Sequence, residues 1–474
     1  MNNIKTKKLQ KDPFLEDLKR IERCKISRCK SLKIGWNTNI KIFPEEIRKL
    51  KWLTSLTVSC TGIKALPDWI GELVNLRKFD ISSNQEIKKL PPSLVNLENL
   101  KELNIDSIGI KALPSFIGKM HSLEYLYFNP CHMTDIPQGI LDLPKLKSIN
   151  VGNIDNAGHI PSLANKCLEL NTKEALRRIK RCKKGNIKKL NLSLLYLDNL
   201  PDKLAELNWL EELDLSCNNL NKLPDWFCNF KKLKILDLSI NKLTSLPDSI
   251  DNLKSLKRIT LDDNRLKTLP ETFGNLSSLE EFYLTEYDNY TPSGSSWFKK
   301  LPDSFGNLSS LKIFYIYDTR LKTLPESFGN LKSLQSLSII SDAQLPANFY
   351  PETIKNLKSI TELQINGFKK VPEFVAELKN LTSLVIEHNR LYKLPDFIGK
   401  LTKLKFLNLH STWIKELPEW ITNLTNLENL DISNNDISHI DPELPHKMPK
   451  LKDTFEWWIK VFKENEDEKI LNNN

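Results

Sequence analysis

The sequence LEELDLSCNNLNKLPDWFCNFKK, residues 210–232, is followed directly by LKILDLSINKLTSLPDSIDNLKS, residues 233–255, and LKRITLDDNRLKTLPETFGNLSS, residues 256–278. Aligned without gaps, they share the pattern L-x-x-L-x-L-x-x-N-x-L-x-x-L-P-x-x-(I/F)-x-x-L-x-x with a period of 23 residues. The L-x-L step alternates as a short strand does, with its leucines pointing inward. The phrase after the proline suits a short helical or 3-10 turn, because proline lacks an N–H that would be unpaired there. Each repeat therefore predicts one coil.

The pattern extends over most of the 474 residues, and 16 of the 25 prolines occupy its apolar-Pro step. A single coil cannot bury its own apolar face, so coils must stack. We expect an α/β solenoid with a curved parallel β-sheet on the concave face, short helical or 3-10 turns on the convex face, and helical caps. About 17 repeats begin at Cys29, Leu53, Leu76, Leu100, Leu123, Leu146, Ile187, Leu210, Leu233, Leu256, Leu279, Leu311, Leu334, Ile360, Leu381, Leu404 and Leu427.

These repeats resemble the leucine-rich-repeat family, and in particular its intracellular Ras-group branch with the L-P-x-x-I-G-N-L phrase. The resemblance covers roughly residues 29–451. It implies a leucine-rich-repeat solenoid that acts as a cytosolic interaction scaffold. Because Ras-group relatives bind small GTPases and phosphatases, it also implies a protein partner of that kind.

The two ends of the chain carry amphipathic segments that suit capping helices. Residues 1–28 form a basic segment with Phe14, Leu18 and Ile21 on one helical face, and residues 452–474 combine a second cap with a polar tail. The apolar face of the second cap consists of Phe455, Trp458, Ile459 and Phe462.

An internal segment resembles the N-terminal cap, since EALRRIKRC at 174–182 matches EDLKRIERC at 16–24. This likeness predicts a first array at 29–165 with about six repeats, a cap-like helix at 166–186, and a second array at 187–451 with about eleven. We expect residues 173–183 to be helical and to cover the last coil of the first array.

One repeat position is occupied by an asparagine in many coils. A buried amide must be hydrogen-bonded, so these side chains are expected to bond the backbone of neighbouring coils rather than a ligand. They are Asn84, Asn218, Asn241, Asn264, Asn389 and Asn435.

Charge and cysteine usage bear on location and partner. Residues 1–52 carry 15 basic and 6 acidic side chains and residues 166–190 carry 10 and 2, whereas the whole chain has a net charge of +10. Basic helices are compatible with nucleic acid or an anionic membrane, but a solvated helix face explains them equally. The chain has no apolar run of membrane-spanning length and no secretory signal. Its eight cysteines form no C-x-x-C pair, which predicts buried thiols in the cytoplasm.

Motifs of catalysis are missing from the sequence. It contains no P-loop, Gly-rich dinucleotide fingerprint, H-E-x-x-H or G-x-S-x-G. His388 and His410 occupy neighbouring coils and could form a metal or acid–base pair, although solvated histidines explain them more simply. We therefore expect no enzyme activity, cofactor or metal.

The outward strand positions of the second array predict a binding surface. Tyr283, Tyr315 and Tyr317 are expected side by side, from three coils in succession, and exposed aromatic residues are enriched in protein–protein hot spots. Isoleucines extend this surface and carboxylates surround it, which favours a partner with basic residues. These further residues are Ile313, Ile340, Asp262, Asp263, Glu281, Glu286 and Asp318.

Two long coils border this surface. The coil from Leu279 has 32 residues and the coil from Leu334 has 26, so extra residues must loop out. The candidate anchors in these loops are Tyr290, Trp297, Phe349 and Tyr350. The alternative is that the loops have no function and simply tolerate sequence changes. The sequence thus predicts a non-catalytic protein-interaction scaffold, with a recognition module for a peptide, pathogen or anionic ligand as the alternative.

Overall fold

The computed structural model forms two compact units, which are described separately. Unit 1 comprises Met1–Arg177 with Leu195–Leu197, and unit 2 comprises Arg178–Leu194 with Asp198–Asn474. The residues that the structure describes are 13–37, 40–130, 133, 135–151, 160–286, 298–317, 320–341, 344–346 and 348–461.

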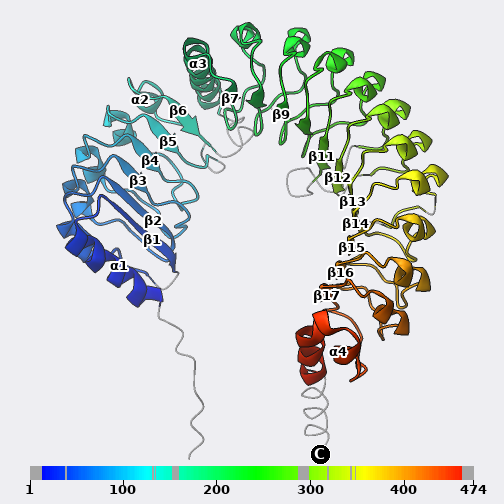
Figure 1. Cartoon of the computed structure of the whole chain (residues 1–474). Coiled ribbons are helices and arrows are strands. Elements are labelled where there is room, and N and C mark those ends of the chain that lie inside the picture. Colours follow the sequence, from blue (N-terminus) through cyan, green and yellow to red (C-terminus); the bar gives the residue numbers. More distant parts are fainter. Residues whose placement is uncertain are drawn as a thin grey trace, which may run out of the picture. The chain divides into compact units, whose positions relative to one another are not determined.

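Unit 1 contains a six-stranded sheet in the order β1-β2-β3-β4-β5-β6, and every neighbouring pair is parallel. Figure 1 shows its outer turns along one side of the strands. The strands are β1 Ser31–Asn37, β2 Ser55–Thr61, β3 Lys78–Asp80, β4 Glu102–Asn104, β5 Tyr125–Tyr127 and β6 Ser148–Asn150. The helices are α1 Pro13–Ser27, η1 Glu45–Lys49, η2 Asp68–Glu72, η3 Pro92–Asn96, η4 Ser115–Lys119 and α2 Gln138–Leu141, where η marks a 3-10 helix.

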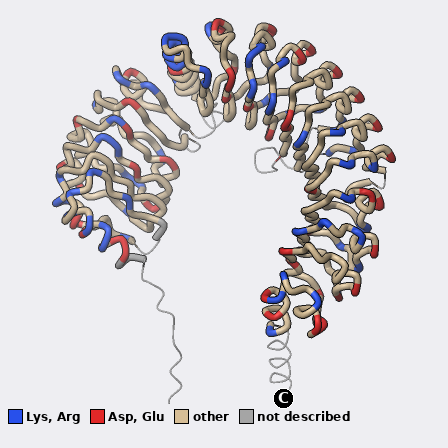
Figure 2. Tube along the Cα trace, viewed as in Figure 1, with Lys and Arg blue, Asp and Glu red and all other residues tan. Residues whose placement is uncertain are grey.

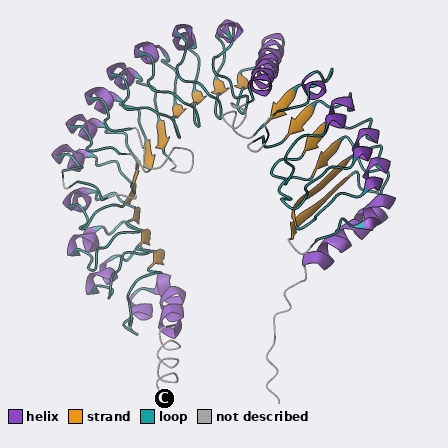
Figure 3. Cartoon of the chain, turned by 180° about the vertical axis from the view of Figure 1, so that it is seen from behind, coloured by secondary structure: helices purple, strands orange, loops and turns teal. Residues whose placement is uncertain are grey.

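Unit 2 contains an eleven-stranded sheet in which sequence order is also spatial order, from β7 to β17. Its strands line the inner, concave side of the unit and its 3-10 turns the outer side (Figures 1 and 3). The strands are β7 Lys189–Asn191, β8 Glu212–Asp214, β9 Ile235–Asp237, β10 Arg258–Thr260, β11 Glu281–Thr285, β12 Ile313–Tyr317, β13 Ser336–Ile340, β14 Glu362–Ile365, β15 Ser383–Val385, β16 Phe406–Asn408 and β17 Asn429–Asp431.

The outer turns of unit 2 are short 3-10 helices, followed by a C-terminal cap. The turns are η6 Asp202–Glu206, η7 Asp225–Asn229, η8 Asp248–Asn252, η9 Glu271–Asn275, η10 Asp303–Asn307, η11 Glu326–Asn330, η12 Glu352–Asn356, η13 Glu373–Glu377, η14 Asp396–Lys400 and η15 Glu419–Asn423; the cap contains α4 Leu444–Lys447 and η16 Pro449–Leu451. The described residues thus contain one parallel strand for each of the 17 repeat starts, which confirms the predicted solenoid.

Each coil turns at its repeat proline. In the coil from Leu233, Pro247 precedes η8 with a φ of −65°, and the N–H of Leu253 closes the turn on the carbonyl of Ile250. The inward side chains Leu236 and Leu238 of the same coil are completely buried. The proline and the alternating leucines therefore have the local roles that the repeat pattern predicts.

The repeated asparagines bond neighbouring coils, as predicted. Asn241 Nδ2 donates to the carbonyl of Leu215 in the preceding coil at 3.0 Å, and its Oδ1 accepts the N–H of Leu220 at 3.0 Å. Asn218, Asn264 and Asn435 make the corresponding donation to the coil before them. These amides satisfy backbone groups that the stacking of coils would otherwise bury unpaired.

Close backbone approach explains the glycine of the G-N-L phrase. A Cβ at Gly306 would lie 2.0 Å from the carbonyl oxygen of Ser327, so only glycine allows the turns of these two coils to pack. Beneath this layer the rings of Phe273 and Phe305, and of Phe305 and Phe328, stack with centroids 6.1 Å apart in each pair. The phenylalanines at this repeat position thus form a continuous stack through successive coils of the core.

The internal helix α3, Pro161–Gly185, confirms the helix predicted at 173–183 but begins before the expected residue 166. Leu163, Cys167 and Leu170 in its first half belong to the buried core of unit 1. Lysine and arginine are concentrated along α3 (Figure 2). Several of these cations pair with nearby carboxylates, as Lys166 and Lys173 do with Glu169.

Helices α1 and α3, which precede the two arrays, each end with a cysteine near a carbonyl group of the following turn, but only α1 ends in a disulfide. Cys24 Sγ lies 3.6 Å from the carbonyl oxygen of Cys29, and Cys182 Sγ lies 3.2 Å from that of Ile187. Cys24 and Cys29 form a disulfide with a Cα–Cα distance of 4.9 Å. The prediction of thiols was therefore wrong for this pair, because the turn after α1 brings two cysteines together that are five positions apart.

The predicted end caps are helical where they are described. In α1, Ile21 is buried and Leu18 is half-buried. Residues 452–461 are helical, with Phe455 buried and Trp458 and Ile459 half-buried. The side chain of Phe14 and residue Phe462 lie outside the described part of the chain.

Candidate functional site

The three predicted tyrosines lie on two adjacent strands of unit 2. Tyr283 of β11 is in register with Tyr315 of β12, and their ring centroids are 6.2 Å apart. Tyr317 lies two residues further along β12, opposite Thr285. The expectation of three coils in succession was wrong, because Tyr315 and Tyr317 belong to the same strand. All three side chains are half-buried, so each keeps part of its surface exposed.

Two isoleucines extend this surface along the sheet. Ile313 is at the start of β12, and Ile340 of β13 is in register with Tyr317. Both are half-buried. We call Tyr283, Ile313, Tyr315, Tyr317 and Ile340 the tyrosine patch.

Arg258, which the sequence reasoning missed as part of this site, holds one of the surrounding carboxylates. Its Nε and Nη2 donate to both oxygens of Glu281 at 2.5 and 2.9 Å, a bidentate geometry that gives a strong ion pair. These hydrogen bonds lower the pKa of Glu281. Tyr283 Oη donates to Glu281 at 3.2 Å, while burial raises the pKa of this phenol. The available signal was that Arg258 and Glu281, of opposite charge, occupy the same outward position in successive coils.

Of the other predicted carboxylates, those that the structure describes do not form the expected open acidic rim. Asp262 Oδ1 accepts the N–H of Thr285 at 2.6 Å, and burial raises the pKa of this carboxyl group. Asp263 and Glu286 are only 9% and 7% exposed. Because these groups face structural neighbours and Glu281 is paired, little negative charge is presented to a partner.

The predicted loop anchors have different outcomes. Asp318, Tyr290 and Trp297 lie outside the described residues. Phe349 is 1% exposed and was wrongly predicted as an exposed anchor. Tyr350 stands directly before Pro351, where other coils have an inward apolar residue, and its hydroxyl group is buried. The extra residues of this coil precede both side chains, so Phe349 lies in the core and Tyr350 is half-buried with its hydroxyl group enclosed.

The two histidines face each other without a site for a metal. The rings of His388 and His410 are 5.3 Å apart between centroids, and His410 Nδ1 lies 2.8 Å from Ser433 Oγ. Across the described ranges, no group of three or more His, Cys, Asp or Glu residues could hold a metal ion.

A cluster that the sequence reasoning missed lies at the loop edge of β15 and β16. The guanidinium of Arg390 lies 4.9 Å from the ring centroid of Trp413, and the Tyr392 and Trp413 rings are perpendicular at 5.8 Å. Tyr392 and Trp413 are 51% and 41% exposed. Both have positive φ angles, 57° and 64°, which are unusual for bulky side chains. No repeat position marks this backbone conformation, so only the exposed aromatic residues themselves could have signalled the cluster.

Lysines flank glutamates at the repeat position before several strands of unit 2. Glu280 accepts hydrogen bonds from Lys257 at 2.7 Å and from Lys312 at 2.6 Å, and these bonds lower its pKa to about 2. Glu211 is held in the same way by Lys188 and Lys234. This row of ion pairs joins coils at the edge of the concave face.

Comparison with known protein families identifies the type of repeat that forms the coils. A leucine-rich repeat region model matches residues 290–391, and a leucine rich repeat model matches 185–243, 231–286 and 379–437. These coils are leucine-rich repeats. Such repeats are typically non-catalytic modules that bind proteins or other ligands. Apart from Leu195–Leu197, the matched residues lie in unit 2, and they include the tyrosine patch.

Among sequence relatives, TMV resistance protein N of Nicotiana glutinosa is 29% identical over 179 residues. That match spans 36% of this chain and only 14% of the tobacco protein. The chain therefore covers only a small part of the length of that relative.

Solved leucine-rich-repeat structures resemble the chain in outline. A leucine-rich-repeat protein of Leptospira interrogans is 26% identical, with a TM-score of 0.43 and coverage of 91% of this chain and 97% of that one. A plant peptide hormone receptor in complex with RGF2 is 21% identical, with a TM-score of 0.37 and coverage of 85% and 62%. In the described part of this chain, no helix is both long and apolar enough to span a membrane.

Proposed function

We propose that this protein is a non-catalytic interaction scaffold that binds a protein partner through the tyrosine patch. The observation that carries this proposal is the pairing of Tyr283 and Tyr315 on adjacent strands, with Tyr317 and two isoleucines beside them. Tyrosine supplies a large contact area and a hydroxyl group at a low entropic cost, and it is enriched in binding hot spots.

The electrostatics of the patch favour an aromatic and hydrogen-bonding interface over a strongly charged one. Arg258 neutralises Glu281, and Asp263 and Glu286 are largely buried. The proposed partner therefore presents apolar and polar groups to the tyrosines rather than a basic surface. This revises the partner chemistry that the sequence alone predicted.

We also propose that the repeats are of the intracellular Ras-group type and that the partner is a small GTPase or a phosphatase. The L-P-x-x-I-G-N-L phrase supports this choice. The cytoplasmic location remains a prediction, supported by the free thiols of Cys60, Cys167, Cys182, Cys217 and Cys228, while the Cys24–Cys29 disulfide counts against it.

Affinity capture with the full chain tests the scaffold. Wild type and the triple variant Y283A/Y315A/Y317A are compared on the same lysate, and captured proteins are quantified by mass spectrometry. Tyr127 of β5 in unit 1 occupies the strand position of Tyr283 and Tyr315, and Tyr125 lies two residues before it on the same strand, so Y125A/Y127A is the control. The proposal expects at least one protein that wild type and control retain and the triple variant loses; identical capture by all three would contradict it.

Salt separates this proposal from binding to nucleic acid or an anionic membrane. Contacts to phosphates weaken steeply as salt rises, whereas an aromatic-centred interface does not. Retention of the captured protein between 50 and 200 mM salt, about the range over which phosphate contacts are lost, is the expected result. Nuclease-sensitive capture that collapses over this range would favour the nucleic-acid alternative.

A further inference from the structure

The extra residues of the 26-residue coil from Leu334 contact the next coil of unit 2. Leu345, within the extra residues, donates its N–H to the carbonyl of Gly367 in the next coil at 2.6 Å. Tyr350 takes the position before the repeat proline that Val371 has in the following coil. A looped strip of chain is thus held against the neighbouring coil by its backbone and leaves cavities on both sides.

Two cavities adjoin at this strip. One has a volume of about 730 Å³ and the other about 910 Å³, and both are lined by Gln344, Phe368 and Lys369. Each lies within the size range of ligand pockets, roughly 300–1,000 Å³. We call the two together the coil-13 groove; its length across three coils suits an extended peptide better than one small molecule.

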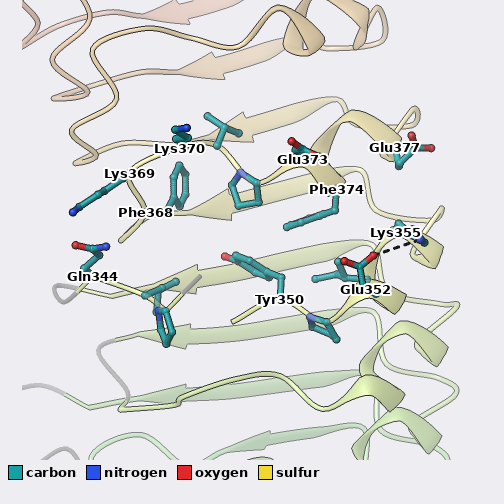
Figure 4. A pocket seen from close by; sticks show the side chains of 16 residues that line it. Gln344, Tyr350, Glu352, Lys355, Phe368, Lys369, Lys370, Glu373, Phe374 and Glu377 are labelled. Atoms are coloured by element: carbon teal, nitrogen blue, oxygen red, sulfur yellow. Dashed lines mark ion pairs between the residues drawn. The ribbon is translucent and has the colours of Figure 1, made fainter. Parts of the chain in front are cut away.

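The first cavity has an apolar middle. Figure 4 shows Tyr350 and Phe374 next to each other, with Gln344, Lys369 and Lys370 at one end and Glu352, Glu373 and Glu377 at the other. The Tyr350 and Phe374 ring centroids are 4.8 Å apart. The Tyr350 hydroxyl is buried and has no hydrogen-bond partner among the described residues, so a donor is left unpaired in the wall of the cavity.

The second cavity is cationic. Its described lining contains Lys369, Arg390 and His388 and no carboxylate. Tyr392 lines it as well and leads to the exposed Trp413. Cations beside exposed aromatic rings form a surface that attracts negative charge and offers apolar contact. The opposite end of the groove carries glutamates, two of which pair with lysines: Glu352 with Lys355 at 3.5 Å and Glu377 with Lys358 at 3.4 Å.

We propose that the coil-13 groove binds a peptide segment in which acidic residues adjoin a large apolar side chain. The acidic residues face Lys369 and Arg390, and the apolar side chain enters the cavity of Tyr350 and Phe374. This site is separate from the tyrosine patch on the strands. It prefers an acidic ligand, whereas the sequence predicted a basic partner for the tyrosine patch.

Selection from a phage-displayed random 12-residue peptide library on the full chain tests the ligand class. The proposal expects enriched peptides to carry Asp or Glu beside Phe, Leu, Trp or Tyr. It also expects K369E/R390E to weaken their binding at least about tenfold, which corresponds to about 1.4 kcal/mol. The charge-matched control K222E/K400E reverses two exposed lysines outside the groove and should bind as wild type does.

A second pair of variants tests the cavity itself. Gln344 is exposed and lines both cavities, so Q344W obstructs them without altering the core and should abolish binding of the selected peptides. Y350F removes only the enclosed hydroxyl, keeps the ring in place, and should therefore bind the peptides as wild type does. Peptides without acidic residues, or peptides that bind K369E/R390E or Q344W as well as wild type, would overturn the proposal. Because Y283A/Y315A/Y317A leaves the groove intact, its effect on partner capture is a separate result.

Discussion

Tyr283 and Tyr315 lie opposite each other on adjacent parallel strands, with their ring centroids 6.2 Å apart. The pair is a consequence of register, because each coil repeats the same strand position beside that of the coil before it. A residue type that recurs at one outward position therefore becomes a continuous surface. The same geometry, applied to inward positions, produces the asparagine and phenylalanine series of the core.

The asparagine series predicts a large effect from one buried amide. Asn241→Ala leaves the buried N–H of Leu220 without its partner and removes one of the two hydrogen bonds that the carbonyl of Leu215 accepts, so the free energy of unfolding should fall by about 1–3 kcal/mol. Urea denaturation followed by circular dichroism measures this change. Asn252→Ala, at an exposed position of η8, is the control and should change stability by less than about 0.5 kcal/mol. Equal losses of unfolding free energy in the two variants would contradict a stabilising role for the buried amide.

The glycine of the outer turn should not tolerate a methyl group. Gly306→Ala places a Cβ against the carbonyl of Ser327, and the strain should lower stability by about 1–3 kcal/mol. Gly139→Ala is the matched control, since its Cβ meets nothing closer than 3.7 Å. Thermal unfolding of both variants provides the comparison. A Gly306→Ala protein as stable as wild type would show that the coils can separate without cost.

Acid should weaken the ion-pair row of unit 2. Hydrogen bonds from Lys257 and Lys312 lower the pKa of Glu280 from 4.5 to about 2 in the folded protein. A lowered folded-state pKa means that the contribution to stability is complete above about pH 4.5 and is lost as pH falls towards 2. The contribution is small because the pair is exposed and screened by water and salt.

Denaturation midpoints of wild type and Glu280→Gln, measured from pH 7 to pH 2.5, check this sign. The difference between the two proteins should shrink as the pH falls through that window. Glu326→Gln, on the outer turn η11, controls for loss of a surface charge. A difference that grows with acid would contradict the assignment.

The repeat pattern predicts the coils well and their insertions poorly. Period and leucine spacing determine which side chains of a regular coil point inward, so the strands, the asparagine bonds and the outward tyrosines could be placed. In the coil from Leu334, however, spacing does not say where the extra residues leave the core. Phe349 and Tyr350 were assigned to the loop, whereas the structure returns the chain to the core before them.

The sequence also did not predict the burial of the carboxylates near the tyrosines or the backbone conformation of the Arg390 cluster. The carboxylates near the tyrosines share outward repeat positions, but burial of Asp263 and Glu286 depends on neighbouring loops. The cluster of Arg390, Tyr392 and Trp413 depends on positive φ angles that no sequence position marks. Both features arise from contacts between coils rather than from the pattern within one.

The tyrosine patch is tested most directly by the dissociation constant for the protein that wild type captures, measured by calorimetry with purified components. Truncation of hot-spot tyrosines costs about 2 kcal/mol or more, so Y283A/Y315A/Y317A should weaken binding by about 30-fold or more. Y125A/Y127A should bind as wild type does, and the triple variant should keep its thermal stability because the tyrosines lie on the surface. An unchanged dissociation constant for the triple variant would contradict the claim that this surface binds the partner.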